Sequence, residues 1–383
     1  MPAFKSRIES ALAERKTQGL NRSMNVVFAG NQSVLEHEGR RYINFSSNDY
    51  LGLANDQALV RAWQQGLSVY GSGSGASPMV TGFSAAHSNL EAALTEWLGY
   101  DRAILFGSGF SANQALLFTL LEKSDVLIQD RLNHASLMEA GALSPAKMKR
   151  FKHNDIEHLK SLINSEDNHL VVTEGVFSMD GDCAPLSDIA EVTRSHDAWF
   201  AVDDAHGIGV LGQSGGGSCE LATVKPEILI VTFGKAFGMS GAAILCDHAT
   251  GDFLTQFARH HVYSTAIPPA QAYALTHAVS MVQEQSWRRE KLSELSEVYR
   301  DCLSDLEGFV ETQTSIKPFV IGESELALQV ASACRQNGIW VTAIRPPTVP
   351  KGTSRLRITL TANHTNEQVK TLSMALKQAL GAL

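Results

Sequence analysis

The segment Ile228-Leu-Ile-Val-Thr-Phe-Gly-Lys-Ala-Phe-Gly238 places a single lysine, Lys235, directly after an apolar run of β-forming residues. The run shows no alternation of polar and apolar residues, which is typical of a strand covered by helices on both faces. Helical patterns separate it from five similar runs, at residues 103–106, 125–129, 169–173, 199–202 and 242–246. Because helices between strands form parallel crossovers, we predict an α/β fold with a mainly parallel, doubly wound sheet.

An N-terminal arm is expected before this sheet. Phe4, Ile8 and Leu12 recur at helical spacing among charged residues, which predicts an amphipathic helix that packs on a larger body. A second helix is predicted to begin at Ser88, the first residue of a Ser-x-x-Glu capping-box pattern, and to end at Gly99.

The C-terminal part of the chain predicts a smaller domain. Beyond Pro268-Pro269 a long helical region is followed by short strands near residues 316–321, 340–344 and 356–361. A last helix is expected after Thr365, which has a capping-box spacing to Gln368. The predicted division is a helical arm over 1–45, a large α/β domain over 46–283 and a smaller α+β domain over 284–383.

The composition of the chain argues against nucleic acid and membranes as partners. The net charge is -8, and no run of Lys and Arg is long enough to form a basic stripe for nucleic acid or an anionic membrane. The five cysteines are scattered and contain no Cys-x-x-Cys pair, so neither a disulfide framework nor a zinc site is expected. No stretch approaches the roughly 18 apolar residues of a membrane span. We expect a cytoplasmic protein whose partners are small molecules and other proteins.

Lys235 is the first candidate for chemistry. In open parallel sheets, ligands bind beyond the carboxyl ends of the strands, where Lys235 is expected to lie between two glycines. An amine presented in this way is typical of a lysine that forms a Schiff base with a carbonyl cofactor such as pyridoxal 5'-phosphate. The alternative is a surface lysine in an ordinary turn.

The strand at residues 199–202 is followed by a pair of carboxylates, Asp203 and Asp204. A carboxylate at the end of a buried strand is costly unless it meets a cation, and a protonated pyridine nitrogen is such a cation. Asp203 is the better candidate, and Asp204 is expected to point the other way. The alternatives are a metal-binding pair and a solvated turn, but no second acidic cluster has a clear ligand spacing, so no metal is expected.

Three other loops, which begin at Gly107, Asp130 and Glu174, supply polar groups that a pyridoxal ring and its phosphate need. The turn Gly107-Ser-Gly-Phe-Ser-Ala-Asn113 opens a helix whose free N–H groups suit a phosphate, although it also fits an ordinary strand-to-helix turn. It is not a dinucleotide fingerprint, because Ala112 stands where the third glycine is expected. His134 could stack on an aromatic ring, and Thr232 could give its hydroxyl to a phosphate or simply finish a strand.

Taken together, the motifs resemble the α-oxoamine synthases, a family of fold-type-I pyridoxal-phosphate enzymes. These enzymes condense an amino acid with an acyl thioester and release carbon dioxide. The resemblance covers essentially the whole chain and rests on the segments 46–53, 108–110, 133–136, 173–182, 202–207, 232–235 and 345–350. One departure is Ala236, where many relatives carry glycine.

The resemblance implies a set of cofactor residues. It makes Lys235 the Schiff-base lysine and the base that takes the substrate α-proton, with Asp203 on the pyridine nitrogen and His134 stacked on the ring. The other residues implied to bind the cofactor are Gly109, Phe110, Ser178, His206 and Thr232, together with Ser264 and Thr265 reaching the site of a partner subunit.

The resemblance also implies substrate contacts and an assembly. Arg357 would bind the amino-acid carboxylate, and the other substrate contacts implied are Arg22, Asn48, His134, Glu174 and Thr348. The family is an obligate homodimer with active sites at the subunit interface.

The substrate choice implied by the resemblance is L-alanine with a pimeloyl thioester. This interpretation rests chiefly on Arg345-Pro-Pro-Thr-Val-Pro350 and the segment 263–269. The acyl chain could arrive on coenzyme A or on acyl-carrier protein. The alternatives are a family member that acylates glycine, a non-catalytic subunit of the same fold, and a nicotinamide dehydrogenase. A non-catalytic subunit is expected to lose Lys235 or Asp203, and both are present.

Overall fold

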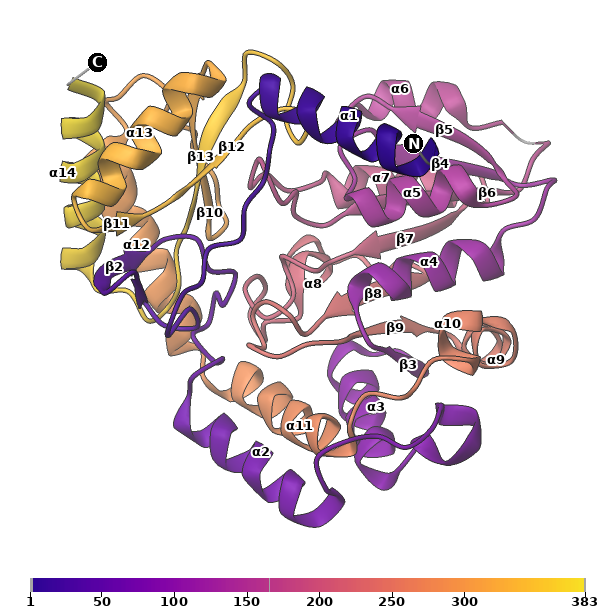
Figure 1. Cartoon of the computed structure of the whole chain (residues 1–383). Helices are drawn as coiled ribbons and strands as arrows, with labels where there is room; N and C mark the ends of the chain where they lie inside the picture. Colours follow the sequence, from indigo (N-terminus) through magenta and orange to yellow (C-terminus); the bar gives the residue numbers. More distant parts are fainter. Residues whose placement is uncertain (1–2, 165, 382–383) are drawn as a thin grey trace.

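The computed structural model describes residues 3–164 and 166–381, and a seven-stranded sheet forms its centre (Figure 1). The strand order is β3-β9-β8-β7-β6-β4-β5. The strands are β3 (Arg102–Phe106), β4 (Val126–Asp130), β5 (Lys147–Phe151), β6 (His169–Glu174), β7 (Trp199–Asp203), β8 (Ile228–Thr232) and β9 (Ala242–Cys246). Only β9 runs antiparallel to its neighbours within this sheet, so the predicted mainly parallel sheet is confirmed.

Successive residues of the strands pack on opposite faces of the sheet. Ile104 and Leu127 join one hydrophobic cluster with side chains of α4, α5 and α9, whereas Leu105 and Ile128 join another with side chains of α3, α7 and α11. This two-sided burial explains why the strands read as apolar runs without alternation. The helices around the sheet are α3 (Ala85–Leu98), α4 (Gly109–Leu120), α5 (Ala135–Leu143), α6 (Ile156–Leu162), α7 (Leu186–Ser195), α8 (Gly217–Ala222), α9 (His248–Phe257), α10 (Arg259–Val262) and α11 (Pro269–Glu284).

The C-terminal part forms a smaller sheet covered by helices (Figure 1). Its strands pair in the order β10-β13-β12. The elements are α12 (Trp287–Leu303), β10 (Ile316–Gly322), α13 (Ser324–Gln336), β11 (Ile339–Trp340), β12 (Thr342–Ile344), β13 (Ser354–Thr359) and α14 (Asn366–Gly381). The expected helix start after Thr365 is confirmed, because the Thr365 N–H donates to Gln368 Oε1 and the Gln368 N–H donates to Thr365 Oγ1.

The N-terminal segment contains strands as well as a helix. β1 (Val34–His37) and β2 (Arg40–Asn44) form a hairpin, and β2 pairs in parallel with β11 of the C-terminal part. Between this hairpin and α3 lie α2 (Gln57–Tyr70) and a short π-helix, η1 (Pro78–Gly82). The N-terminal segment is therefore joined to the C-terminal part by backbone hydrogen bonds. The division into three domains stays a prediction.

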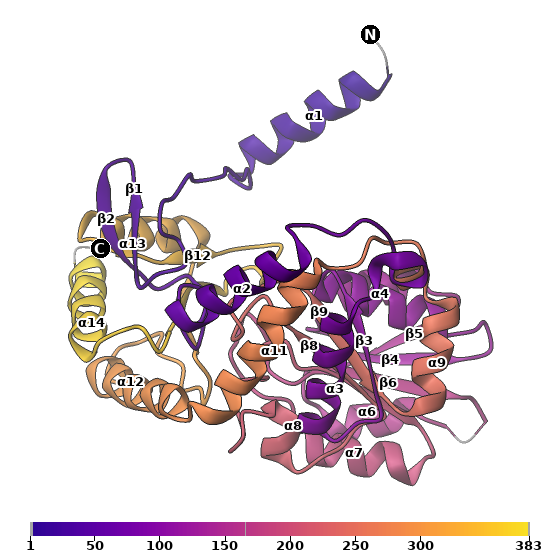
Figure 2. The same cartoon turned by 90° about the horizontal axis from the view of Figure 1, so that it is seen from below.

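The predicted packing of the N-terminal helix on the body of its own chain is wrong. Helix α1 (Ala3–Thr17) projects away from the rest of the molecule (Figure 2), and the side chains of Phe4, Ile8 and Leu12 are 70%, 57% and 63% exposed. The spacing of apolar residues identifies the apolar face of a helix but does not identify what covers it. The apolar face of α1 has no cover within the described chain.

The predicted start of α3 is also wrong. The helix begins at Ala85, and its capping residue is Ser84 in place of Ser88. The backbone N–H of Ser84 donates to Nδ1 of His87, so a histidine takes the part that Glu or Gln usually plays in a capping box. The predicted end is confirmed, since Gly99 adopts a left-handed φ of 73°. Within the described ranges, every helix is too short or too polar to cross a lipid bilayer.

Candidate active site

A cavity of about 230 Å³ opens at the carboxyl ends of the central strands. The loops after β3, β4, β7 and β8 and the last residue of β6 contribute to it, which is where ligands bind in open α/β sheets. Its lining includes seven of the residues expected to hold or surround a cofactor, namely Gly109, Phe110, His134, Asp203, His206, Thr232 and Lys235, together with Glu174. Side chains far apart in the sequence are thus brought to one cavity.

Lys235 lies in the turn that follows β8. Its Nζ lies 3.3 Å from Oγ1 of Thr232, a long contact for a buried amine. Burial lowers the pKa of Lys235, and the nearby carboxylates of Asp203 and Glu174 only partly oppose this shift. The surface-lysine alternative is therefore wrong, because Lys235 is half-buried, its side chain lines the cavity and its amine is biased toward the neutral form.

Asp203 ends β7 and is tied to His134 through two other side chains. The amide nitrogen of Asn113 donates to Asp203 Oδ2 at 2.7 Å and to Ser136 Oγ at 2.9 Å. Ser136 Oγ lies 2.8 Å from Nδ1 of His134. The Ser136 hydroxyl accepts a hydrogen bond from Asn113 and can donate its own proton to Nδ1 of His134. Nδ1 is then an acceptor, so in a neutral imidazole the N–H lies on Nε2. Burial lowers the pKa of His134, which favours this neutral form.

Asp204 points away from the cavity, as expected. Its carboxylate accepts from the N–H of Ser218 at 2.8 Å and from the Ser218 hydroxyl at 2.6 Å. Burial raises the pKa of Asp204 to about 7, although the two bonds from Ser218 oppose the shift. Adjacent residues of a strand face opposite sides, which explains why one aspartate faces the cavity and the other anchors α8.

His206 is buried and contacts a tyrosine that the sequence did not indicate. The hydroxyl of Tyr50 lies 2.5 Å from His206 Nδ1. Burial lowers the pKa of His206 well below its ordinary value, and the neighbouring charge of Lys235 acts in the same direction. A tyrosine that donates to Nδ1 leaves Nε2 free to donate into the cavity.

The lining fits pyridoxal phosphate. Oε1 of Glu174 and Oδ1 of Asn113 are buried without a partner among the described residues, as expected where polar groups face a ligand. The backbone N–H groups of Gly109 and Phe110, the first two of α4, have no intrahelical acceptor and are available to a phosphate, whereas the N–H of Ser111 donates to Ser108 Oγ. A Cβ at Gly109 would come within 2.6 Å of Cγ2 of Thr232, so only glycine lets the loop and the strand end approach so closely.

Arg357 lies on β13 and forms a second group of contacts, with residues from two other segments. Its Nε donates to the carbonyl oxygen of Ser178 at 2.6 Å, and its Nη1 donates to Oδ1 of Asn48 at 2.9 Å. Its side chain is only 7% exposed. The guanidinium is therefore held in one orientation by fixed acceptors, as a carboxylate-binding arginine requires.

Arg357, Asn48 and Ser178 lie outside the lining of the cavity, and so do the remaining predicted residues. Arg22 and Thr348 are exposed, on the segment after α1 and on the loop between β12 and β13. Ser264 and Thr265 are exposed in the segment between α10 and α11. Their positions leave them free to contact another molecule. Their expected roles stay predictions.

Sequence reasoning missed Asn113, Ser136 and Tyr50 as functional residues. Asn113 and Ser136 lie in the first turns of α4 and α5, directly after two predicted loops, so their position at the helix starts was an available signal. Tyr50 lies 156 residues from His206, and no local pattern links the two.

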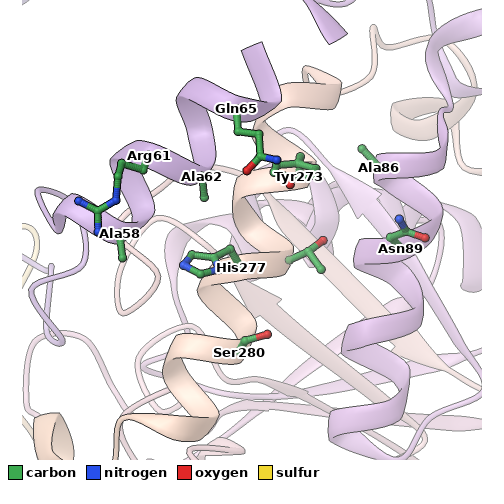
Figure 3. Close-up of a pocket in the computed structure, with 10 residues that line it drawn as sticks. Ala58, Arg61, Ala62, Gln65, Ala86, Asn89, Tyr273, His277 and Ser280 are labelled. Atoms are coloured by element: carbon green, nitrogen blue, oxygen red, sulfur yellow. The ribbon is translucent and has the colours of Figure 1, made fainter. Parts of the chain in front are cut away.

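A larger cavity of about 600 Å³ lies elsewhere, between α2, α3 and α11 (Figure 3). Its lining includes Arg61 and Gln65 of α2 and Tyr273 and His277 of α11, and Gln65 lies next to Tyr273 in this view. In the described chain its lining contains no lysine and no carboxylate side chain. The smaller cavity is therefore the candidate active site.

Comparisons with known proteins identify the family of the chain. Residues 40–376 match the model of the class I and II aminotransferases. The chain is 93% identical to the 8-amino-7-oxononanoate synthase of Vibrio campbellii and 90% identical to that of Vibrio parahaemolyticus. Each comparison covers 100% of this chain and 100% of the relative. The chain belongs to the 8-amino-7-oxononanoate synthases, within the class I and II aminotransferase family.

Solved structures of this family and its neighbours agree with the fold. Serine palmitoyltransferase of Sphingomonas wittichii superposes with a TM-score of 0.91 at 30% identity and covers 100% of this chain and 98% of its own. A serine palmitoyltransferase from S. paucimobilis with a bound PLP-myriocin aldimine gives 0.92 at 28% identity, covering 98% of each chain. The 8-amino-7-oxononanoate synthase from Francisella tularensis gives 0.79 at 29% identity, covering 89% and 98%.

Proposed function

We propose that this chain catalyses the decarboxylative condensation of L-alanine with a pimeloyl thioester, which yields 8-amino-7-oxononanoate, carbon dioxide and the free thiol carrier. The enzyme is an acyltransferase of biotin biosynthesis, and its cofactor is pyridoxal 5'-phosphate. The observation that carries the proposal is the buried amine of Lys235, which faces a cavity that also contains Asp203, His134 and the start of α4. Full-length relatives at 93% and 90% identity bear the name of this activity.

The cofactor supplies an electron sink that stabilises negative charge on the carbon next to its imine nitrogen. In the proposal Lys235 holds its aldehyde carbon and Asp203 pairs with its ring nitrogen. His134 covers one face of the ring, and His206 and Ser178 contact the ring oxygen. The N–H groups of Gly109 and Phe110 and the hydroxyl of Thr232 would bind its phosphate. These roles are consistent with the bonds from Asn113 that orient Asp203 and, through Ser136, His134.

Lys235 has a second role as the base. An amine accepts a proton from the α-carbon of the amino acid only in its neutral form, and burial lowers the pKa of Lys235 toward neutrality. The carboxylate of Asp203 limits this shift. The same amine can then return the proton, because its turn keeps it beside the cavity.

Arg357 is proposed to bind the carboxylate of L-alanine. Its bonds to Asn48 and to the carbonyl of Ser178 fix the plane of the guanidinium. Glu174 would contact the substrate as a neutral acid, since burial and the charge of Asp203 raise its pKa well above its ordinary value. Arg22, His134 and Thr348 are the other proposed substrate contacts.

The proposal includes a homodimer with shared active sites. Ser264 and Thr265 are exposed and lie outside the cavity of their own chain, as expected of residues that complete the site of a partner. Phe4, Ile8 and Leu12 give α1 an exposed apolar face that a second copy would cover. The acyl carrier is coenzyme A or acyl-carrier protein. The five cysteines are free thiols, which fits a cytoplasmic location.

A substrate panel tests this function. Purified enzyme is supplied with L-alanine, glycine or L-serine and with pimeloyl, acetyl or succinyl thioesters, and thiol release and the product mass are measured. We expect L-alanine with the pimeloyl thioester to give the highest kcat/KM. If glycine with an acetyl thioester reacted best, the chain would be an acetyltransferase with the same cofactor site, and the proposed substrates would be wrong.

A further inference from the structure

His153 links two loops of the active site from a position just after β5. Its Nδ1 lies 3.1 Å from Oδ1 of Asp130, the last residue of β4. Its Nε2 lies 2.8 Å from Oδ2 of Asp182, in the loop that follows β6. β4 and β6 are neighbours in the sheet. One imidazole therefore joins the loops that leave two adjacent strands.

Asn154 forms a second link between the same two carboxylates. Its backbone N–H donates to Asp130 Oδ2 at 2.9 Å, and its side-chain amide donates to Asp182 Oδ2 at 2.9 Å. Its φ is 53°, in the left-handed region that asparagine tolerates better than most residues. The backbone turn at residues 153–154 is thus shaped to contact both loops.

The two loops carry residues of both parts of the proposed site. Asp130 Oδ1 accepts the N–H of Leu132 at 2.8 Å and so shapes the turn that leads to His134. The loop over residues 175–183 carries Ser178, whose carbonyl accepts from Arg357. A shift of this loop relative to β4 would therefore move the acceptor that orients Arg357.

The imidazole of His153 carries a positive charge at neutral pH. Burial alone would lower its pKa, but the hydrogen bonds and charges of Asp130 and Asp182 outweigh burial and raise the pKa to about 9. These two carboxylates, one from each linked loop, are the charged groups that act on it. The ring of Phe177 meets it edge-on at 4.4 Å and contributes no charge. The link is therefore a cation between two anions.

We propose that protonated His153 is a positioning residue, which holds the loop over residues 175–183 against the turn before His134 and thereby sets the place of Arg357 relative to the cofactor. This role rests on the proposed function, because Arg357 is taken to bind the amino-acid carboxylate. His153 itself contacts neither the cavity nor Arg357 among the described residues. Its effect is expected on amino-acid binding more than on cofactor binding.

The test uses the holoenzyme and the variants His153→Gln and Asp182→Asn, with His248→Gln as a control for loss of an exposed histidine. We expect each of the first two changes to raise KM for L-alanine on the order of tenfold, and to leave kcat and the cofactor dissociation constant within about twofold. The control is expected to behave as wild type. An equal loss of cofactor affinity, or an unchanged KM in both variants, would overturn the proposal.

The double variant separates a link from two independent defects. If His153 and Asp182 act through each other, the double change raises KM no more than either single change. Multiplying effects would contradict the link. Since Asp182→Asn keeps the histidine, the KM of that single variant still tests the link if His153→Gln folds poorly.

The pH dependence gives a third readout. The pKa of His153 is raised in the folded protein, so the link is fully present below the ordinary histidine pKa and is lost as pH rises through about 9. The ratio of KM in His153→Gln to KM in wild type should therefore fall toward one as pH passes 9. A ratio that stays constant across this range would contradict the proposed charge.

Hydrogen exchange tests the linkage without any turnover. Peptides that cover residues 175–183 should exchange faster in His153→Gln than in wild type, and peptides around Lys235 should not change. If the substrate panel failed but this difference appeared, only the proposed function would be wrong. If turnover were as proposed but exchange and KM were unchanged, only the role of His153 would be wrong.

Discussion

The cofactor part of the site and the amino-acid part are built in different ways. Around Lys235 and Asp203, side chains come from loops at one edge of one sheet. The hydrogen bonds of Lys235, Asp203 and His134 named above join residues 2 to 90 positions apart, and only the bond from Tyr50 to His206 is longer in sequence, at 156 positions. Around Arg357, the bonds reach Ser178 and Asn48, which are 179 and 309 positions away. The first part is fixed by where strands end. The second depends on how the smaller C-terminal sheet packs against the large one.

Because the two parts are built differently, we expect mutations in them to change different measured quantities. A change in the cofactor part should alter cofactor affinity or the chemical step, because those side chains are already connected within one sheet. A change in the amino-acid part should raise KM and leave the cofactor bound.

The largest expected effect is that of Lys235→Ala. Loss of the amine removes both the covalent attachment of the cofactor and the base, so kcat should fall roughly thousandfold or more. The visible absorbance of the covalently held cofactor should also disappear. Stopped-flow turnover and an absorption spectrum of the purified variant measure both effects.

Lys225→Ala is the matched control, since Lys225 is exposed and precedes β8, whereas Lys235 follows it. It should keep the spectrum and the rate. A Lys235→Ala enzyme that stayed coloured and active would remove Lys235 from the cofactor part altogether.

The second prediction concerns Arg357→Lys. A lysine keeps the charge but cannot make two parallel bonds to a carboxylate while it also bonds Asn48 and Ser178. Loss of a charge-assisted bond costs about 1.5–3 kcal/mol, so KM for L-alanine should rise about ten- to hundredfold. The cofactor dissociation constant should not change. Steady-state kinetics and a cofactor titration measure the two quantities.

Arg102→Lys serves as the control, because Arg102 pairs with Asp252 and is the first residue of β3, at the opposite end of that strand from the cavity. It should not change KM. If Arg357→Lys weakened cofactor binding as much as it raised KM, the two parts would not be separable.

The sequence predicted the cofactor part well because strand ends can be located from local patterns. The apolar runs place Asp203 and Lys235 at the ends of β7 and β8, and the order of residues on a strand predicts that Asp204 points away. Adjacent strands then bring these ends together without further information. Local sequence patterns therefore predicted most of the cofactor part of the site.

The sequence predicted the amino-acid part only through the family resemblance. Arg357 is one of several buried polar residues on β13, and nothing local distinguishes it from Arg355, which pairs with Asp180. Its contact with Asn48 depends on packing between distant segments. The prediction that α1 packs on a larger body was wrong for the same reason, because the spacing of Phe4 and Leu12 identifies an apolar face but not the surface that covers it.

The smallest expected effects concern the side chains that connect Asp203 to His134. Asn113→Ala removes bonds to both Asp203 and Ser136, whereas Ser136→Ala removes only the hydroxyl beside His134. A neutral hydrogen bond contributes about 0.5–1.5 kcal/mol, so Ser136→Ala should weaken cofactor binding a few-fold. Asn113→Ala should weaken it about tenfold, since one of its bonds reaches a buried carboxylate.

Equilibrium dialysis of the cofactor measures both variants, with Gln114→Ala as the control, because Gln114 is the next residue of α4 and bonds only the exposed Glu139 among its described hydrogen-bond partners. KM for L-alanine should stay close to wild type in all three. If Asn113→Ala and Ser136→Ala had equal effects, Asp203 would be oriented mainly by the backbone N–H of Ala205, which lies 3.1 Å from its Oδ1. If either variant raised KM for L-alanine instead, these side chains would also position a substrate contact. His134 would then belong to both parts of the site, and the two parts would not be separable.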